Sequence, residues 1–241
     1  QQAYEQAIDY YKRAEQIDPD YSPIYNQLGY SYRYLGRFDK AEEAFQRYIE
    51  LIPDDPNPYD SYAELLLKFG KFDKSIEMYQ KALEINPSFV FSYGGIATNL
   101  MLKGDHQPAR ARLEEMFAAS ENDGRRRQAL TMIAYTHIDQ GDFDQALEQF
   151  DKVSAIAAAA DDSTALANDM VTRAVILLEA GRLDEAEASL EQAWEYLQNA
   201  DVSAEVRRNG EQTGHFMMAR IEVARGNLDS ARMYYRQYAE R

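Results

Sequence analysis

The sequence contains no cysteine, which excludes disulfide bonds, zinc sites with thiolate ligands and cysteine nucleophiles. It has only three histidines, and no two of them have the i, i+4 spacing of a metal-binding pair on a helix. A glycine-rich phosphate loop and a nucleophile elbow are also missing. Adjacent acids such as Glu42 and Glu43 point apart on a helix, whereas a catalytic acid–base pair must converge. We therefore expect no enzyme activity, no metal site and no cofactor.

Basic charge and long apolar runs are scarce as well. The chain has 26 Lys and Arg residues against 41 Asp and Glu, which gives a formal net charge of -15. Nucleic-acid binding depends on clustered Lys and Arg, so we expect no nucleic-acid partner. No window approaches the roughly 18 continuous apolar residues of a spanning helix, so we expect no direct insertion into a membrane. The cytoplasm and the bacterial periplasm are both compatible, because a periplasmic chain can also lack cysteine.

Six glycines recur along the chain, and each ends an apolar helical stretch. Five of the six are followed two residues later by Phe or Leu. Their spacings of 34, 34, 37, 40 and 45 residues are typical of stacked supersecondary units. The six glycines are Gly36, Gly70, Gly104, Gly141, Gly181 and Gly226.

Other positions keep a fixed register to these glycines. The residue seven before each glycine is small, as close contact between two helix backbones requires, and the residue nine after it is a large Phe, Tyr or Leu. Pro53 and Pro87 come seventeen residues after the first two glycines, where proline ends a helix. Each unit therefore predicts two amphipathic helices that are separated by its glycine.

These positions resemble the tetratricopeptide repeat, a pair of antiparallel helices in 34 residues. The run Tyr25-Leu28-Gly29-Tyr32-Ala41-Phe45-Pro53 fits the motif of that family well. The resemblance implies an all-α, right-handed superhelical solenoid of about six helix pairs after a leading half repeat. We expect a single solenoid over residues 1–241, with regular repeats in 1–121 and stretched, irregular repeats in 122–241. The six pairs are expected to start near Pro23, Asn57, Phe91, Arg125, Thr164 and Ala204.

Two places interrupt the regular pattern. Three arginines, Arg125 to Arg127, follow a polar loop where a proline turn is expected. They indicate either a docking point for an acidic partner or, in the interpretation we prefer, a solvated helix start. Gly94 and Gly95 lie inside a first helix, where each glycine costs about 1 kcal/mol relative to alanine. We expect a neighbouring aromatic ring or a partner side chain to fill this gap.

The resemblance also assigns a binding surface, because the first helix of each pair lines the concave groove in this family. The clamp with which some members hold acidic chaperone tails is missing, since Tyr30, Asp60 and Glu64 stand where it needs amide or basic groups. The aromatic residues suit a peptide with hydrophobic side chains, and the alternative is that the rings pack between helices. The candidate groove residues are Asn26, Tyr30, Arg33, Tyr34, Asp60, Glu64, Phe91, Gly94, Thr98, Thr131, Tyr135, Phe216 and Arg220.

Three functions are compatible with these features. The first is a non-catalytic scaffold that binds a peptide segment or a partner protein in the concave groove. The second is an accessory or regulatory arm of a larger enzyme or sensor, whose active domain would lie upstream of Gln1. The third is a homo-oligomeric spacer that self-associates through the C-terminal helix, which carries Met233, Tyr234, Tyr235 and Tyr238.

Overall fold

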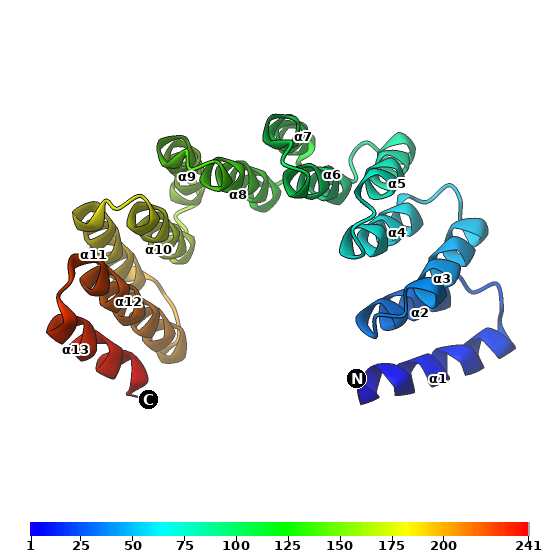
Figure 1. Cartoon of the computed structure of the whole chain (residues 1–241), viewed down its shortest axis with the longest axis horizontal. Coiled ribbons are helices and arrows are strands. Elements are labelled where there is room, and N and C mark those ends of the chain that lie inside the picture. The colour runs from blue at the N-terminus through cyan, green and yellow to red at the C-terminus, as the bar shows by residue number, and fades with distance from the viewer. Residues whose placement is uncertain (241) are drawn as a thin grey trace. The chain divides into compact units, whose positions relative to one another are not determined.

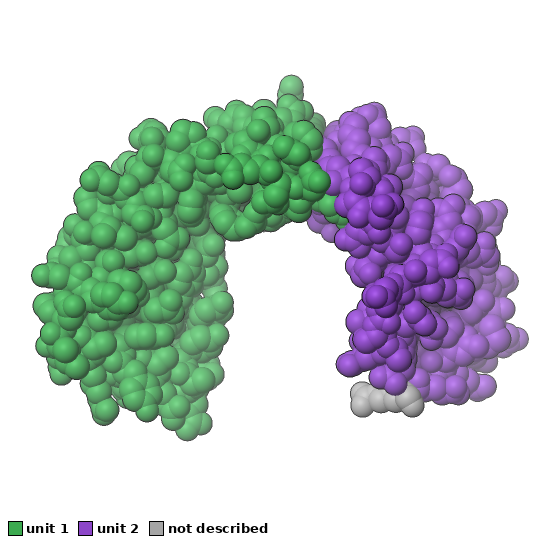
Figure 2. All heavy atoms as spheres, turned by 180° about the vertical axis from the view of Figure 1, so that it is seen from behind, with its two compact units in different colours: residues 1–129 green, residues 130–241 purple. Residues whose placement is uncertain are grey.

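A computed structural model describes residues 1–240 of the chain, and within this range it contains thirteen α-helices and no strand. The chain divides into two compact units, residues 1–129 (unit 1) and residues 130–241 (unit 2), which Figure 2 colours separately. The boundary lies inside α8 (Asp123–Asp139), close to the expected change of repeat length. Whether residues 1–241 form one continuous solenoid stays a prediction.

Unit 1 contains a leading helix, three helix pairs and the beginning of α8 (Figure 1). The helices of its pairs have only 12 to 14 residues each, and each helix packs on the next along the chain. The helices are α1 (Gln2–Ile17), α2 (Pro23–Tyr34), α3 (Phe38–Leu51), α4 (Pro56–Lys68), α5 (Phe72–Ile85), α6 (Val90–Leu102) and α7 (His106–Ala119).

Unit 2 contains the rest of α8 and five longer or terminal helices. The helices α9, α10 and α11 have 17 residues each, and α12 has 22. The helices are α9 (Phe143–Ala159), α10 (Ser163–Glu179), α11 (Leu183–Asn199), α12 (Ala204–Arg225) and α13 (Leu228–Ala239). All six first helices start within two residues of the expected positions, so the predicted all-α architecture of helix pairs is confirmed.

The six recurring glycines end the six first helices in a left-handed backbone conformation. Their φ angles lie between 72° and 83°, a region that a residue with a side chain enters only at a cost. Asp161, with φ 53°, is the only other residue of this kind in the described part of the chain. It lies two residues after the end of α9 at Ala159, so the chain turns there without a glycine.

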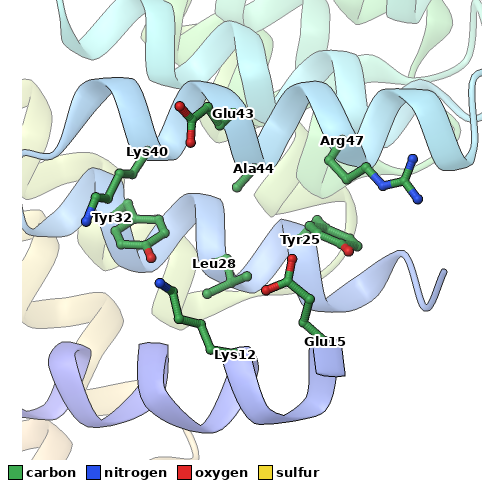
Figure 3. A pocket seen from close by; sticks show the side chains of 9 residues that line it. All are labelled: Lys12, Glu15, Tyr25, Leu28, Tyr32, Lys40, Glu43, Ala44 and Arg47. Carbon is green, nitrogen blue, oxygen red and sulfur yellow. The ribbon is translucent and has the colours of Figure 1, made fainter. Parts of the chain in front are cut away.

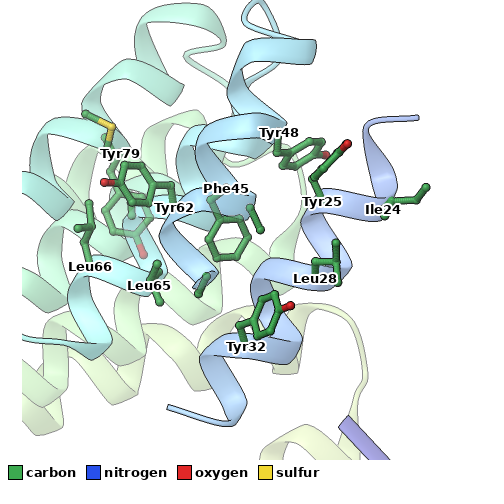
Figure 4. Close-up of a cluster of buried hydrophobic side chains, with 14 of the residues drawn as sticks. Ile24, Tyr25, Leu28, Tyr32, Phe45, Tyr48, Tyr62, Leu65, Leu66 and Tyr79 are labelled. Carbon is green, nitrogen blue, oxygen red and sulfur yellow. The ribbon is translucent and has the colours of Figure 1, made fainter. Parts of the chain in front are cut away.

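The core of unit 1 combines aromatic rings with leucine and isoleucine side chains, as the labelled residues of Figure 4 show. A Cβ atom on Gly29 would lie 2.5 Å from the Phe45 ring, so only glycine allows α2 and α3 to approach this closely. In the same way, a Cβ atom on Gly95 would lie 2.2 Å from the Tyr79 ring. The expected gap in α6 is therefore filled at Gly95 by a neighbouring aromatic ring.

Unit 2 has its own core, which follows the same plan. Phe150 stands nine residues after its repeat glycine, as Phe45 does in unit 1, and both rings are almost fully buried. The two glycines in the N-terminal half of α12 again face large side chains. A Cβ atom on Gly214 would lie 2.4 Å from the Trp194 indole, and one on Gly210 would lie 2.3 Å from Leu197. Glycine therefore sets the distance between α11 and α12.

Candidate functional site

The first helices of each unit contact one another and form what we term its first-helix face. In unit 1, α4 contacts both α2 and α6, and in unit 2, α10 contacts α12. In five of the six pairs the second helix packs against its first helix, as Figure 1 shows for α5 above α4. All thirteen candidate residues lie on first helices, and the structure brings several of those in unit 1 into direct contact.

A hydrogen-bonded cluster joins α2 to α4 on the face of unit 1. The Tyr30 hydroxyl lies 3.2 Å from a carboxylate oxygen of Glu64 and 3.2 Å from the Ser61 hydroxyl. Arg33 donates to the same Glu64 oxygen at 3.1 Å. The Tyr30 ring is half-buried and packs edge-on against Phe45, with the centroids 5.4 Å apart. Tyr30 therefore connects helices, as the alternative interpretation of the rings expected.

Asp60 is a buried acid one turn from this cluster. It is only 8% exposed, and the Ser92 hydroxyl of α6 donates to it at 2.7 Å. Burial raises the pKa of the Asp60 carboxyl to about 6, with a smaller contribution from Glu64 and against the effect of the Ser92 bond. Burial likewise raises the pKa of Tyr30 to about 12. The face of unit 1 thus holds a desolvated acid that accepts a hydrogen bond from α6.

The other candidates in unit 1 differ in exposure. Tyr34 is 56% exposed and stacks on Tyr4 of α1 at 4.7 Å. The Oδ1 atom of Asn26 is buried and has no hydrogen-bond partner. Thr98 donates to the carbonyl oxygen of Gly94 at 2.9 Å, so its hydroxyl is used inside α6. Tyr34 is therefore the candidate here that offers the largest exposed ring surface.

Arg125 and Arg126, two of the three arginines at the start of α8, contact neighbouring side chains. The Arg125 guanidinium lies 3.8 Å from the centroid of the half-exposed Phe91 ring, and Arg126 pairs with Asp123 at 3.1 Å. Arg125 also donates to Gln128 at 3.1 Å. These contacts favour the helix-start interpretation over a free docking point.

In unit 2, four candidates lie on α8 and α12. Tyr135 is 46% exposed, and Thr131 is half-buried one turn before it. Phe216 is 37% exposed and packs against Tyr238 of α13, with centroids 5.3 Å apart. Arg220 pairs with Glu179 of α10 at 3.0 Å, so this pair joins the two first helices.

Unit 2 also contains a cleft that none of these candidates lines. It has a volume of about 230 Å³, lies between α10, α11 and α12, and has no charged side chain in its lining. Asn168, Val171 and Thr213 stand ten or thirteen residues before a repeat glycine. The groove candidates Asn26, Asp60 and Phe91 have the same spacings, so this spacing is the signal in the sequence that points to the cleft. The lining includes Val171, Leu190, Trp194, Leu197, Gly210 and Gly214.

A second cleft, of about 340 Å³, lies in unit 1 between α1 and α3 and is shown in Figure 3. Tyr25, Leu28 and Tyr32 of α2 line it from one side. Around them stand cationic and anionic side chains together, so the lining favours no single charge of ligand. These charged residues are Lys12, Glu15, Lys40, Glu43 and Arg47.

Among residues 1–240, no group of three or more His, Asp or Glu side chains is placed to hold a metal ion. No helix in the described range combines the length and the apolar character that crossing a membrane requires.

Comparison with known proteins identifies the family. The model of the MalT-like TPR region matches residues 61–241, and a model of the tetratricopeptide repeat matches residues 20–88. The chain belongs to the MalT-like TPR family. It is thus a tetratricopeptide repeat (TPR) protein, as the resemblance of its sequence indicated. Proteins built from this repeat are in general non-catalytic scaffolds for protein interactions.

Solved structures agree on the fold. The C-terminal part of a TPR repeat-containing protein from Cytophaga hutchinsonii is 16% identical, with a TM-score of 0.64 over 98% of this chain and 89% of that one. The type IV pilus biogenesis factor PilW is 18% identical, with a TM-score of 0.62 over 90% and 91%. PilF from Pseudomonas aeruginosa is 16% identical, with a TM-score of 0.59 over 99% and 95%. No curated protein sequence matches this TPR chain significantly.

Proposed function

We propose that this TPR protein is a non-catalytic scaffold that binds a peptide segment or a partner protein on its first-helix faces. The observation that supports this most is the set of rings left exposed there. Tyr34, Phe91 and Tyr135 are each about half exposed on first helices, although large apolar side chains favour burial. Rings on a rigid helix give large contact areas at a low cost in conformational entropy.

Asp60 and Glu64 of unit 1 favour partner groups of a particular charge. Asp60 and Glu64 lie one turn apart, and both accept hydrogen bonds from residues of neighbouring helices. A partner group that donates hydrogen bonds or carries positive charge would stabilise the ionised Asp60 carboxylate, which burial disfavours. We therefore expect peptides that combine apolar side chains with basic ones.

A random peptide library displayed on phage, panned against the whole chain, tests this function. Phe91→Ala and Tyr135→Ala, singly and combined, should weaken the enriched peptides at least tenfold in calorimetric titrations. Phe117→Ala on α7 and Tyr10→Ala on α1 are matched controls. They remove exposed rings from helices that are not part of the first-helix faces, and each should change affinity less than twofold. Undiminished binding by the Phe91→Ala/Tyr135→Ala double variant would reject the first-helix faces as the binding surface.

Self-association is a second candidate function, favoured by the apolar side chains exposed at the end of the chain. Leu228, Met233 and Tyr238 on α13 are each about half exposed. Sedimentation equilibrium of the wild type and of Tyr238→Glu tests it. A concentration-dependent dimer that the substitution abolishes would support this function, and a monomer at every concentration would exclude it.

A further inference from the structure

The cleft of unit 2 has a definite size and chemistry. Its volume of about 230 Å³ is smaller than the roughly 300–1,000 Å³ of sites that hold cofactors or drug-sized ligands. It is large enough for one bulky apolar side chain. Val171, Leu190 and Leu197 make its walls apolar, and no charged residue lines it, although the chain as a whole has a net charge of -15. A charged group that entered would lose its hydration without a partner.

The walls of the cleft are held by close packing. Gly214 lies against the Trp194 indole and Gly210 against Leu197, so that the backbone of α12 closes directly onto α11. The edge of the Trp194 ring also packs against His215, with centroids 6.2 Å apart. These contacts hold the backbone of α12 against α11, so the helices that form the cleft are in place before any ligand arrives, which lowers the entropic cost of binding.

The rim of the cleft carries polar groups from the first helices. Thr172 and Thr213 donate their hydroxyl protons to the carbonyl oxygens of Asn168 and Asn209, at 3.0 Å in each case, which leaves the lone pairs of both hydroxyls as acceptors. The side-chain amide of Asn168 makes no hydrogen bond within the described residues, so it can donate to a peptide and accept from it. An apolar interior with a neutral polar rim suits a side chain that is attached to peptide groups.

We infer that this cleft binds one leucine-sized to phenylalanine-sized side chain of a partner peptide, with the adjoining peptide groups at the rim near Asn168. This inference rests on the proposed scaffold function and names where and how unit 2 takes part in it. The occupant is neutral and apolar because the lining offers no counter-ion. The volume of about 230 Å³, below that of sites for drug-sized ligands, suits a single side chain.

Trp194 is the only tryptophan in the chain and lines the cleft, so its indole N–H resonance reports on this site alone. The full chain is titrated with four blocked amino acids: the N-acetyl amides of leucine, phenylalanine, glycine and glutamate. The leucine or phenylalanine derivative should shift the Trp194 resonance saturably and bind at least tenfold more tightly than the glycine and glutamate derivatives. No saturable shift, or equal shifts with all four, would overturn the inference.

Substitutions in and beside the cleft locate the binding. Val171→Phe fills the cleft and should weaken the preferred derivative at least tenfold, whereas Val175→Phe, one turn further on α10 and outside the cleft, should change it less than twofold. Circular dichroism checks that both variants fold. Thr213→Leu narrows the cleft from an exposed position of α12 and should also weaken binding, even where Val171→Phe disturbs the core. Unchanged affinity in folded Val171→Phe and Thr213→Leu would show that the shift arises elsewhere.

The two sets of experiments distinguish a failure of the cleft assignment from a failure of the scaffold function. If library peptides depend on Phe91 and Tyr135 while no blocked amino acid shifts Trp194, only the cleft assignment fails. If the cleft takes the phenylalanine derivative while no peptide depends on these two rings, the scaffold function as proposed fails. A shift of the Trp194 resonance on dilution of the protein alone would mean that a second copy fills the cleft, which overturns the assignment to a peptide partner.

Discussion

The first-helix face of unit 1 is tied together by hydrogen bonds between side chains, whereas that of unit 2 surrounds an apolar cleft. In unit 1, Tyr30, Glu64 and Arg33 join α2 to α4, and Ser92 joins α6 to Asp60. In unit 2, Arg220 and Glu179 join α12 to α10, and the cleft lies between the same two helices and α11. Both units use the same helix pair, so the pair itself does not decide what its face can bind.

The difference follows from helix length. A regular first helix starts about thirteen residues before its glycine, as α2 does at Pro23, and this register would start α12 near Thr213. The helix instead begins at Ala204, so Gly210 lies in an added segment. Leu197, which faces Gly210, lies near the end of the lengthened α11. Part of the cleft is therefore made by residues that a 34-residue repeat does not contain.

The largest expected effect comes from removing a buried ring from each unit, which tests whether the two cores are packed in the same way. Phe45→Ala and Phe150→Ala remove buried rings at the same register position. Each should lower the free energy of unfolding by about 3–5 kcal/mol, because a large cavity replaces the ring. Urea unfolding followed by circular dichroism measures both. A cost below about 1 kcal/mol in one unit only would mean that its core collapses around the cavity, and that the two cores differ.

The raised pKa of Asp60 predicts that the stability of unit 1 depends on pH. Its pKa is raised from 3.8 to about 6 in the folded chain, so the native state holds this proton more tightly than the unfolded state does. The contribution to stability is complete below pH 3.8 and is lost as the pH rises to about 6. Asp60→Asn removes this loss and keeps an acceptor for Ser92. The variant should therefore gain up to about 3 kcal/mol over the wild type between pH 4 and pH 7.5.

Urea unfolding at both pH values measures this gain. Asp54→Asn, at an exposed position in the turn before α4, is the control for the loss of one negative charge. A gain of equal size in Asp54→Asn would assign the effect to the net charge of the chain, and not to the burial of Asp60.

Two Gly→Ala substitutions compare a tightly packed helix contact in unit 1 with a contact beside the cleft in unit 2. In Gly95→Ala the new methyl group meets the Tyr79 ring, which is 3% exposed and has no space to move into. We expect a loss of about 1–3 kcal/mol, despite the better helix propensity of alanine. In Gly214→Ala the neighbour is Trp194, which is half-buried and borders the cleft, so its ring can shift. We expect a loss below about 1 kcal/mol there.

Thermal and urea unfolding measure both variants. The double variant Gly95→Ala/Tyr79→Leu should recover part of the loss, because the smaller side chain makes room for the methyl group. If Gly214→Ala costs as much as Gly95→Ala, the cleft gives Trp194 no freedom, and the two contacts are equivalent.

The fold could be predicted from the sequence because it depends on local rules with a fixed register. Left-handed glycines, small residues seven positions earlier and rings nine positions later define each pair without knowledge of distant contacts. The register also placed Tyr30 and Glu64 on one face. It gave no indication that they bind each other, because that contact joins residues 34 positions apart and depends on side-chain conformation.

The cleft shows more clearly what the distance to a repeat glycine cannot predict. Asn168, Val171 and Thr213 could be placed on the groove side from their distance to a glycine, but the cleft also needs Trp194 and Leu197 of a second helix. How closely α11 and α12 approach depends on Gly210 and Gly214, and Gly210 lies in the lengthened part of α12, for which the repeat motif provides no position. A motif predicts the residues that all repeats share, and a specific site is made from those that they do not.

The smallest effect compares the helix starts of the two units. Asp55 accepts a hydrogen bond from the backbone N–H of Asn57 at the start of α4, and Asp162 accepts one from Ala165 at the start of α10, each at 2.9 Å. Asp55→Ala and Asp162→Ala should each cost about 1 kcal/mol, because an N–H of the first turn loses its acceptor. Urea unfolding gives both values, and Asp→Asn at the same positions should restore most of the loss, since asparagine caps equally well.

Helix α4 also has Pro56 to fix its first turn, whereas α10 relies on the cap alone before a longer helix that borders the cleft. A larger loss for Asp162→Ala, together with weaker binding of the phenylalanine derivative, would therefore mean that the start of α10 helps to hold the cleft in shape.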